Sequence, residues 1–432
     1  MLLSPALTAR LAKANGFIFS VYAITAAFCT YFCMYAFRKP FAAATFDGEV
    51  ALPLIAAPLA LKTVYIISQV LGYCCSKFLG IKVISEMTAE RRAVSILVVI
   101  AVAWGSLLLF AVVPAPYNAL CLFLNGLPLG MVWGLVFGFL EGRKLSEVLG
   151  AGLSASYILA SGVVKSVGRT LVTDYGISEF WMPVAVGAIF ALPMVVFVWM
   201  LANLPPPSAE DEKLRSKRAP MDAAARKKFF LGFLPGLLPL TMLYVLLTAY
   251  RDFRDNFAVE IWAAIGYADE PAILATSEIP ITIGVLLSLA LLMLIKDNRK
   301  ALLMVHVLML SGTAMIGIST LLFQMQILDP AYWMIAVGLG MYLAYVPYGC
   351  VLFDRLIAAV GAVGTAGFLI YVTDAFGYLG SVSLMLYKDL GQAELSWLDF
   401  FMNFSYITSV SCTVLYLIST VYFARQTRPL AA

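Results

Sequence analysis

The chain has 432 residues, of which 62% are hydrophobic and only 12% are charged, and its formal net charge is +4. Because soluble domains carry about 25% charged residues, this composition excludes an ordinary soluble domain. Many apolar stretches reach the roughly 20 residues that span a bilayer core. The sequence therefore predicts an all-α, polytopic membrane protein.

Twelve transmembrane helices are predicted along the chain. Between the sixth and the seventh, the segment LPPPSAEDEKLRSKR combines three adjacent prolines with many charges, which indicates a linker. It divides the chain into an N-terminal six-helix bundle (1–204), a cytoplasmic linker (205–228) and a C-terminal six-helix bundle (229–432). The predicted spans are 15–44, 52–79, 93–114, 116–140, 148–173, 179–203, 229–260, 270–296, 300–326, 330–353, 361–387 and 400–424.

The predicted orientation follows from the basic residues. If both termini share one side, most of the 29 Lys and Arg residues, Lys77 among them, fall in the loops and helix ends of that side. Cytoplasmic loops carry such an excess. We therefore expect a multi-pass protein of the cell inner (cytoplasmic) membrane with both termini in the cytoplasm. This topology accounts for the net positive charge, and no nucleic-acid partner is expected.

Metal, cofactor and catalytic sites are not predicted. All seven cysteines lie in apolar runs, and no CxxC pair is present. Neither a disulfide framework nor a zinc site is therefore expected. His306, the only histidine, is expected to have a packing role. Without a recognisable catalytic set, the chain is not expected to be an enzyme.

Two similar stretches carry arginines near the ends of the first and the seventh spans. YFCMYAFRKPF contains Arg38, and YVLLTAYRDFRDNF contains Arg251. A tyrosine, Tyr31 or Tyr244, lies seven residues before each arginine. Two six-helix halves repeated in parallel are the architecture of the major facilitator fold, in which substrate binds at the repeat interface. We therefore expect both arginines to line a central cavity.

An arginine inside a membrane protein requires water, a partner or a ligand, because at a helix centre it costs about 2.5–3.5 kcal/mol. Two such groups on one cavity repel each other, and an anionic substrate stabilises both. The planar guanidinium suits this role because it binds carboxylate or phosphate oxygens in pairs and stays charged. One alternative is that Arg38 and Lys39 extend to the outer interface. The other is a structural ion-pair cluster of Arg251, Asp252, Arg254 and Asp255.

The first span contains a tyrosine, a second tyrosine four residues later, an arginine–lysine pair and a phenylalanine: Tyr31, Tyr35, Arg38, Lys39 and Phe41. This pattern resembles the organophosphate:phosphate antiporters, the glycerol-3-phosphate transporter group of the major facilitator superfamily. GTAGFLIYVTDAFGYLG (364–380) is similar to the eleventh span of that group. In the family the first-span arginine and its seventh-span counterpart bind phosphate, and the latter position matches Arg251.

The chain also departs from that group. The second-span lysine of the family falls at Gln69. The fifth-span histidine has no match, and Lys165 is the nearest basic residue. With these departures, the chain resembles a separate bacterial branch of the superfamily more than the antiporters themselves.

The predicted function is secondary active transport of a small anionic solute (an organophosphate, phosphate or carboxylate) by alternating access, as a monomer in the lipid bilayer. Arg38 and Arg251 are expected to bind the anion. The supporting donors are Tyr31, Tyr35, Lys39, Lys165 and Arg254. Asp374 is the candidate for energy coupling, with proton symport and anion exchange both open. The alternatives are a carrier of neutral or cationic solutes and a non-transporting receptor or enzyme on the same fold.

Two further patterns concern the fourth and the tenth spans. Small residues recur every four positions in the fourth span, which favours close helix packing: Gly126, Gly130, Gly134 and Gly138. Tyrosines recur every three positions in the tenth span, and they either line a pathway or pack in the core: Tyr342, Tyr345 and Tyr348.

Overall fold

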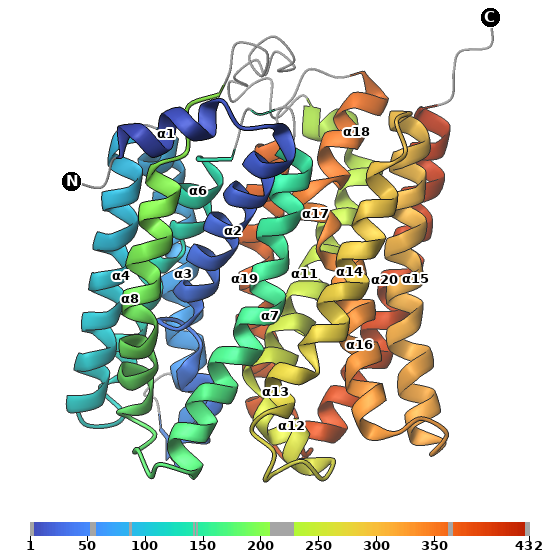
Figure 1. Cartoon of the computed structure of the whole chain (residues 1–432). Coiled ribbons are helices and arrows are strands. Elements are labelled where there is room, and N and C mark those ends of the chain that lie inside the picture. The colour runs from blue at the N-terminus through green and yellow to red at the C-terminus, as the bar shows by residue number, and fades with distance from the viewer. Residues whose placement is uncertain are drawn as a thin grey trace, which may run out of the picture. The chain divides into compact units, whose positions relative to one another are not determined.

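The computed structural model describes residues 4–51, 58–85, 89–140, 143, 146–207, 229–361 and 366–427. Its regular structure is almost entirely helical, as predicted (Figure 1). The strands β1 (Glu49–Val50) and β2 (Leu59–Ala60) form one antiparallel pair. In chain order the helices are α1 (Pro5–Ala12), α2 (Gly16–Tyr35), the 3-10 helix η1 (Pro40–Ala43), α3 (Leu61–Ser85), α4 (Ala89–Val112), α5 (Ala119–Leu129), α6 (Val132–Phe137), α7 (Ser146–Thr173), α8 (Met182–Ala202), α11 (Leu234–Asn256), α12 (Ala258–Ala264), α13 (Ile273–Thr276), α14 (Glu278–Met293), α15 (Asn298–Gln324), α16 (Pro330–Tyr345), α17 (Pro347–Cys350), α18 (Leu352–Val360), α19 (Ala366–Gly391) and α20 (Trp397–Gln426).

Ten helical stretches of the described chain are long and apolar enough to cross a membrane. The helices α3 and α19, with 25 and 26 residues, also have the length of membrane spans. Together they make the twelve long helices that the sequence predicts for a multi-pass membrane protein. Large apolar side chains are exposed on these helices, such as Leu192 (73% exposed) and Leu291 (66%), as expected where a surface faces lipid.

Both arginine-bearing spans are broken near their ends, which the sequence prediction missed. The predicted span 15–44 consists of α2, which ends at Tyr35, a turn, and η1, which starts at Pro40. Proline has no N–H to donate and its ring clashes with the carbonyl four residues earlier, so a regular helix does not continue through it. The predicted span 229–260 likewise divides into α11 and α12.

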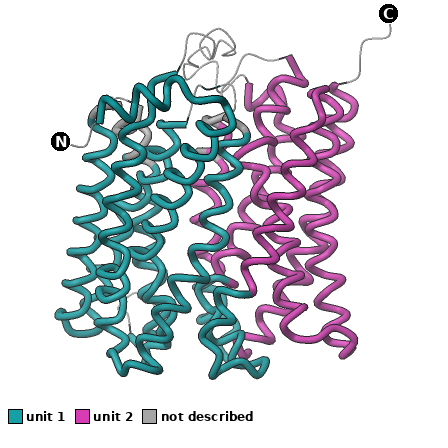
Figure 2. Tube along the Cα trace, in the orientation of Figure 1, with its two compact units in different colours: residues 1–215, 255–276, 385–394 teal, residues 216–254, 277–384, 395–432 magenta. Residues whose placement is uncertain are grey.

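The chain packs into two compact units (Figure 2). Unit 1 contains residues 1–215, 255–276 and 385–394, and unit 2 contains the remainder, residues 216–254, 277–384 and 395–432. The division at residues 254 and 255 falls inside α11. The predicted halves 1–204 and 229–432 stay a prediction, and most of the predicted linker lies outside the described residues.

Close contacts at glycines fix the position of α3 in unit 1. A Cβ atom on Gly126 of α5 would lie 2.2 Å from the carbonyl oxygen of Gln69 and 2.9 Å from the backbone nitrogen of Tyr73. One turn later, a Cβ atom on Gly130 would also lie too close to α3. The close packing expected from the glycine repeat is therefore confirmed at these two positions, and it holds Gln69 and Tyr73 in place.

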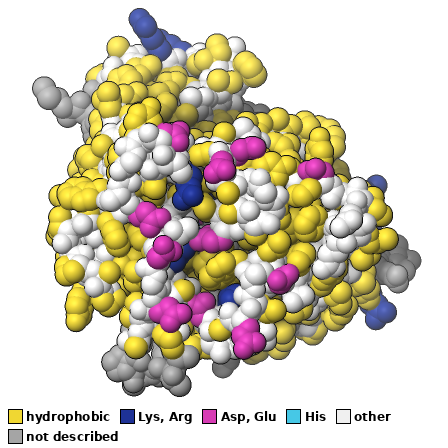
Figure 3. Space-filling model, turned by 90° about the horizontal axis from the view of Figure 1, so that it is seen from below, with side chains coloured by type: hydrophobic (Ala, Val, Ile, Leu, Met, Phe, Trp, Pro, Cys, Tyr) yellow, Lys and Arg dark blue, Asp and Glu magenta, His cyan; other side chains and the backbone are white. Residues whose placement is uncertain are grey.

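Some of the loops in each unit carry exposed acidic residues. Asp47 and Asp174 in unit 1, and Asp329 in unit 2, are exposed in loops between long helices. Figure 3 shows one face of the molecule on which many Asp and Glu side chains gather. Such loops agree with the predicted orientation, in which most basic residues lie on the other, cytoplasmic side. The orientation itself stays a prediction.

Candidate functional site

Two cations contact one tyrosine ring in unit 1. The guanidinium carbon of Arg38 lies 3.8 Å from the centre of the Tyr73 ring, and the Lys77 Nζ atom lies 5.3 Å from it. Arg38 and Lys77 are 4% and 8% exposed. Tyr73 is midway along α3. We call these three residues the Tyr73 stack, in which the aromatic face attracts cations that also repel each other.

Two buried amides hold the backbone that carries Arg38. The Gln69 Nε2 atom donates to the carbonyl oxygen of Arg38 (2.7 Å) and to the Oδ1 atom of Asn125 (2.7 Å). Asn125 donates in turn to the carbonyl oxygens of Phe37 and Ala103, both at 2.9 Å. Carbonyls at a helix end have no partner within the helix. Gln69 and Asn125 therefore position Arg38 where α2 has ended.

The two predicted tyrosines lie in an aromatic cluster beside Arg38. The ring centres of Tyr31 and Tyr35 are 5.7 Å apart, and the Tyr31 ring lies 5.2 Å from that of Trp133. The Arg38 guanidinium lies 5.9 Å from the Tyr35 ring. Both tyrosines are buried. The structure thus brings Tyr31, Tyr35 and Arg38 together, and their role in substrate binding stays a prediction.

A second group of cations in unit 1 surrounds the carboxylate of Asp255. The Nζ atoms of Lys39 and Lys165 lie 2.6 and 2.7 Å from its two oxygens, and Ser161 also donates to it. The alternative of a structural ion-pair cluster paired Asp255 with the arginines, whereas in the structure Asp255 pairs with these lysines. Lys39 is 5% exposed, so it lies within the protein rather than at an outer interface.

A neighbouring ion pair joins Lys62 to Glu260, and Lys62 also donates to the carbonyl oxygen of Ala42 (3.1 Å). We call Lys39, Lys62, Lys165, Asp255 and Glu260 the lysine cluster. Removing one member of a buried ion pair is strongly destabilising, because it leaves a buried charge behind. The lysine cluster therefore ties residues 255–260 to α3, α7 and the turn after α2.

Arg251 lies in a hydrogen-bonded network in unit 2. Its Nε and Nη2 atoms donate to the Oδ1 atom of Asp252 at 3.1 and 2.7 Å, and its Nη1 atom donates to the Tyr345 hydroxyl. The Tyr345 and Tyr244 hydroxyls are 2.8 Å apart, and Tyr244 donates to Asp374. Ser381 donates to the second oxygen of Asp252 (2.7 Å). We call these six residues the Arg251 network.

Arg254 lies in a separate ion pair of unit 2. Its Nη1 atom is 2.8 Å from the Oε1 atom of Glu278, and its Nη2 atom donates to the carbonyl oxygen of Met334 (3.2 Å). A Cβ atom on Gly338 would lie 2.7 Å from Nη2, so this glycine makes room for the guanidinium. Of the suggested structural ion-pair cluster, the Arg251–Asp252 pair is present, whereas Arg254 pairs with Glu278.

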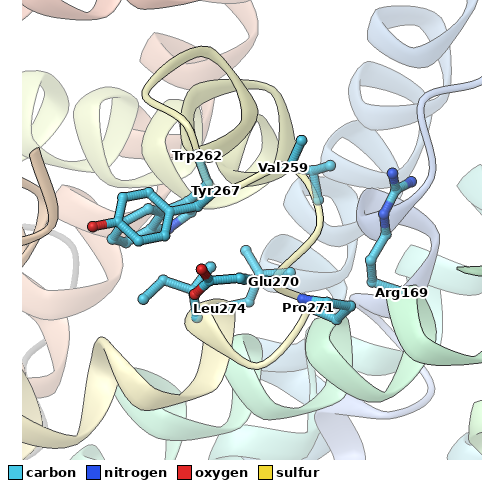
Figure 4. Close-up of a pocket in the computed structure, with 9 residues that line it drawn as sticks. Arg169, Val259, Trp262, Tyr267, Glu270, Pro271 and Leu274 are labelled. Carbon is cyan, nitrogen blue, oxygen red and sulfur yellow. The ribbon is translucent and has the colours of Figure 1, made fainter.

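A small pocket in unit 1 lies at the loop between α12 and α13 (Figure 4). Trp262 and Tyr267 line one part of it, and Arg169 of α7 and Pro271 line another. Its lining does not include any of the predicted site residues among those that the structure describes. The residues of the Tyr73 stack and the lysine cluster, which belong to the same unit, are likewise not in its lining.

Sequence reasoning missed several residues of these groups, although part of the signal was present. Gln69, Tyr73 and Lys77 recur every four residues, which places them on one face of a helix. In the predicted topology, Lys77 was instead one of the basic residues on the cytoplasmic side. Asn125 and Glu260 carried no comparable signal, because their partners are distant in the sequence.

The comparisons with known proteins first define the fold. A D-xylose–proton symporter is similar with a TM-score of 0.60 and 14% identity, over 94% of this chain and 97% of that chain. A peptide transporter in complex with sulfate gives 0.58 and 13%, over 94% of both chains. A nucleoside transporter gives 0.57 and 16%, over 94% and 99%. The chain therefore has the twelve-helix major facilitator fold.

The sequence comparison then assigns the family. Residues 40–426 match the model described as "Family of unknown function (DUF5690)", and the chain belongs to that family. No curated protein matches the sequence. The likeness to the organophosphate:phosphate antiporters stays a prediction.

Proposed function

We propose that the protein is a secondary active transporter that moves a small anionic solute across the inner membrane by alternating access, as a monomer with both termini in the cytoplasm. Its twelve-helix fold supports this proposal, since the similar solved structures include carriers for a sugar, a peptide and a nucleoside. The proposed solute is an organophosphate, phosphate or carboxylate, in keeping with the first-span resemblance. No enzymatic role is proposed.

The Tyr73 stack carries the proposal of an anionic solute. It places two buried cations, Arg38 and Lys77, on one ring midway along a membrane-spanning helix. Buried cations in a membrane protein mark substrate or ion pathways, and an anion would offset their mutual repulsion. The lysine cluster adds three lysines against two carboxylates. This gathering of cations in unit 1 supports the proposal of a negatively charged solute.

In this proposal Arg38 and Arg251 bind the anion, and Tyr31, Tyr35 and Lys77 support Arg38. Lys39, Lys165 and Arg254 complete the proposed set; in the structure Asp255 pairs with the two lysines and Glu278 with Arg254. The Arg251–Asp252 pair favours a second candidate, a carrier for a neutral solute in which Arg251 is structural.

The test is binding and uptake by the purified full chain. Thermal unfolding is measured with phosphate, glycerol 3-phosphate, succinate and neutral sugars, and uptake of the same labelled solutes is measured in proteoliposomes. We expect stabilisation and uptake with an anion, and their loss in Arg38→Lys, which keeps the charge but loses the planar fork. Arg169→Lys, a partly buried arginine of unit 1 outside the proposed site, is the control. Uptake of a neutral solute alone, unchanged by Arg38→Lys, would favour the second candidate.

A further inference from the structure

Three cations lie in the turn that joins α14 to α15 in unit 2. The turn reads KDNRK, from Lys296 to Lys300; the two lysines are exposed and Arg299 is half-buried. Within the described chain, Lys296, Arg299 and Lys300 form no ion pair with a carboxylate. The Nε atom of Arg299 is buried there without a hydrogen-bond partner. The turn therefore carries positive charge that the described protein does not neutralise.

Two acidic side chains accompany these cations. Asp297, inside the turn, caps α15, because its Oδ1 atom accepts from the backbone nitrogen of Lys300 at 2.7 Å. Asp354 lies on α18, next to Arg355, whose Nη1 atom donates to the Oδ1 atom of Asn298 at 2.9 Å. This bond joins α18 to the turn, at one end of unit 2 (Figure 1). Four cations thus gather with two carboxylates on an ordered scaffold.

An apolar surface begins directly beside the turn on both helices. On α14 and its C-cap, Leu291 and Leu294 lie three residues apart and are both exposed. On α15, Lys300 is followed by Met304 and Val307, which are also exposed. Residues three and four positions apart share one face of a helix. Each helix therefore presents an apolar face to its surroundings, with the cations where the two helices meet.

The orientation of the chain explains only part of this arrangement. An excess of exposed Lys and Arg in short loops is what a cytoplasmic side requires, and the predicted orientation places this turn there. That bias does not require a guanidinium to be half-buried without a partner for its Nε atom, as Arg299 is. A charged group withdrawn from water in this way calls for a partner of opposite charge.

We propose that this end of unit 2 is a binding site for an anionic phospholipid, an inference independent of the proposed transport. The phosphate oxygens of the headgroup accept from Lys296, Arg299 and Lys300, in charge-assisted hydrogen bonds. The acyl chains lie along the apolar faces that begin at Leu291 and Met304. Basic sites between transmembrane helices on the cytoplasmic side bind lipid headgroups in this way. A soluble phosphate shares the headgroup chemistry but leaves the apolar faces unused.

The test measures lipid binding to the purified full chain by native mass spectrometry in a neutral detergent. The probes are phosphatidylglycerol and the zwitterionic phosphatidylcholine. In Lys296→Gln/Lys300→Gln we expect the affinity for phosphatidylglycerol to fall about 30-fold, because each cation near a membrane surface contributes about 1 kcal/mol. The affinity for phosphatidylcholine should change little. Both substitutions keep the α15 cap, which uses a backbone nitrogen.

The matched control is Arg10→Gln/Lys13→Gln, which removes two exposed cations from unit 1. It should keep the wild-type affinity for phosphatidylglycerol. An equal loss in both double variants would show attraction by overall charge and would overturn the site. So would an unchanged affinity in Lys296→Gln/Lys300→Gln. Should that variant not fold, Lys300→Gln replaces it, with Lys13→Gln as control and about a fivefold loss expected.

A competition experiment separates the lipid from a soluble phosphate. Glycerol 3-phosphate, which has the same phosphate ester without acyl chains, is added at the concentration of phosphatidylglycerol. We expect the lipid to stay bound, because the apolar faces contribute to its affinity. Displacement by glycerol 3-phosphate would assign the site to a soluble anion and overturn the lipid. None of these measurements involves uptake, so this inference and the proposed function can fail separately.

Discussion

The two arginines of the internal repeat have opposite surroundings. Arg38 is followed by Lys39, and Arg251 is followed by Asp252. In unit 1 the Tyr73 stack and the lysine cluster together contain five cations and two carboxylates. In unit 2 the Arg251 network contains one cation and two carboxylates. The residue after each arginine is thus a cation in unit 1 and an anion in unit 2, and in unit 2 this anion pairs with the arginine.

The lysine cluster offers the largest expected effect. In Asp255→Asn, Lys39 and Lys165 lose the charge that they share, and breaking a buried ion pair costs about 3–5 kcal/mol. We expect a clear drop in the thermal unfolding temperature of the purified protein. The exposed Asp269→Asn should leave it unchanged. An equal drop in both variants would show that Asp255 does not stabilise unit 1.

Two variants, Arg38→Lys and Arg251→Lys, measure how much each arginine contributes to anion affinity. Losing one partner of a buried charge contact costs about 2 kcal/mol or more, so we expect anion affinity to fall about 30-fold in Arg38→Lys. Arg251 is paired with Asp252. Arg251→Lys should therefore lose less anion affinity than Arg38→Lys. Isothermal titration with phosphate, glycerol 3-phosphate or succinate measures both. A larger loss for Arg251→Lys would reverse the assignment of the two regions.

Removing an amide that positions Arg38 should have an intermediate effect. Gln69→Leu leaves the Arg38 carbonyl without this donor, at a cost of about 1–3 kcal/mol, and shifts the guanidinium on the Tyr73 ring. We expect weaker anion binding together with lower stability. Asn118→Leu is the matched control, since Asn118 is a buried amide of unit 1 that bonds to Tyr65. It should lower stability while anion affinity stays the same.

The smallest effect is expected at the Asp252 end of the Arg251 network. Ser381→Ala removes one hydrogen bond to Asp252, with a cost of about 0.5–1.5 kcal/mol. We expect a slight loss of thermal stability and little change in uptake, with Arg251 still paired. Ser383→Ala, a position on the same helix whose hydroxyl bonds only to a backbone carbonyl in the described structure, should not alter uptake.

The sequence predicted the twelve long helices because apolar length is a local property. It also predicted that Tyr31, Tyr35 and Arg38 belong together, since they share one short stretch. The partners of the other charges could not be predicted in this way. Asp255 pairs with Lys39 and Lys165, which lie 216 and 90 residues away, so only the folded chain brings them together.

Helix ends were a further limit of the sequence prediction. The pattern of apolar residues continues through 36–44, and only Pro40 marks the point where α2 cannot continue. The prediction therefore treated Arg38 as part of a regular helix. In the structure its carbonyl accepts a hydrogen bond from a side chain, which places the guanidinium on Tyr73.

The interruption of α2 has a consequence for the entropy of binding. A free arginine side chain carries about 2 kcal/mol of rotamer entropy, and a ligand that had to immobilise it would lose that much affinity. Arg38 is already ordered by the Tyr73 ring and by amides that bond to its backbone. The guanidinium is thus preorganised, and a solute that binds Arg38 as we propose would have less disorder to remove.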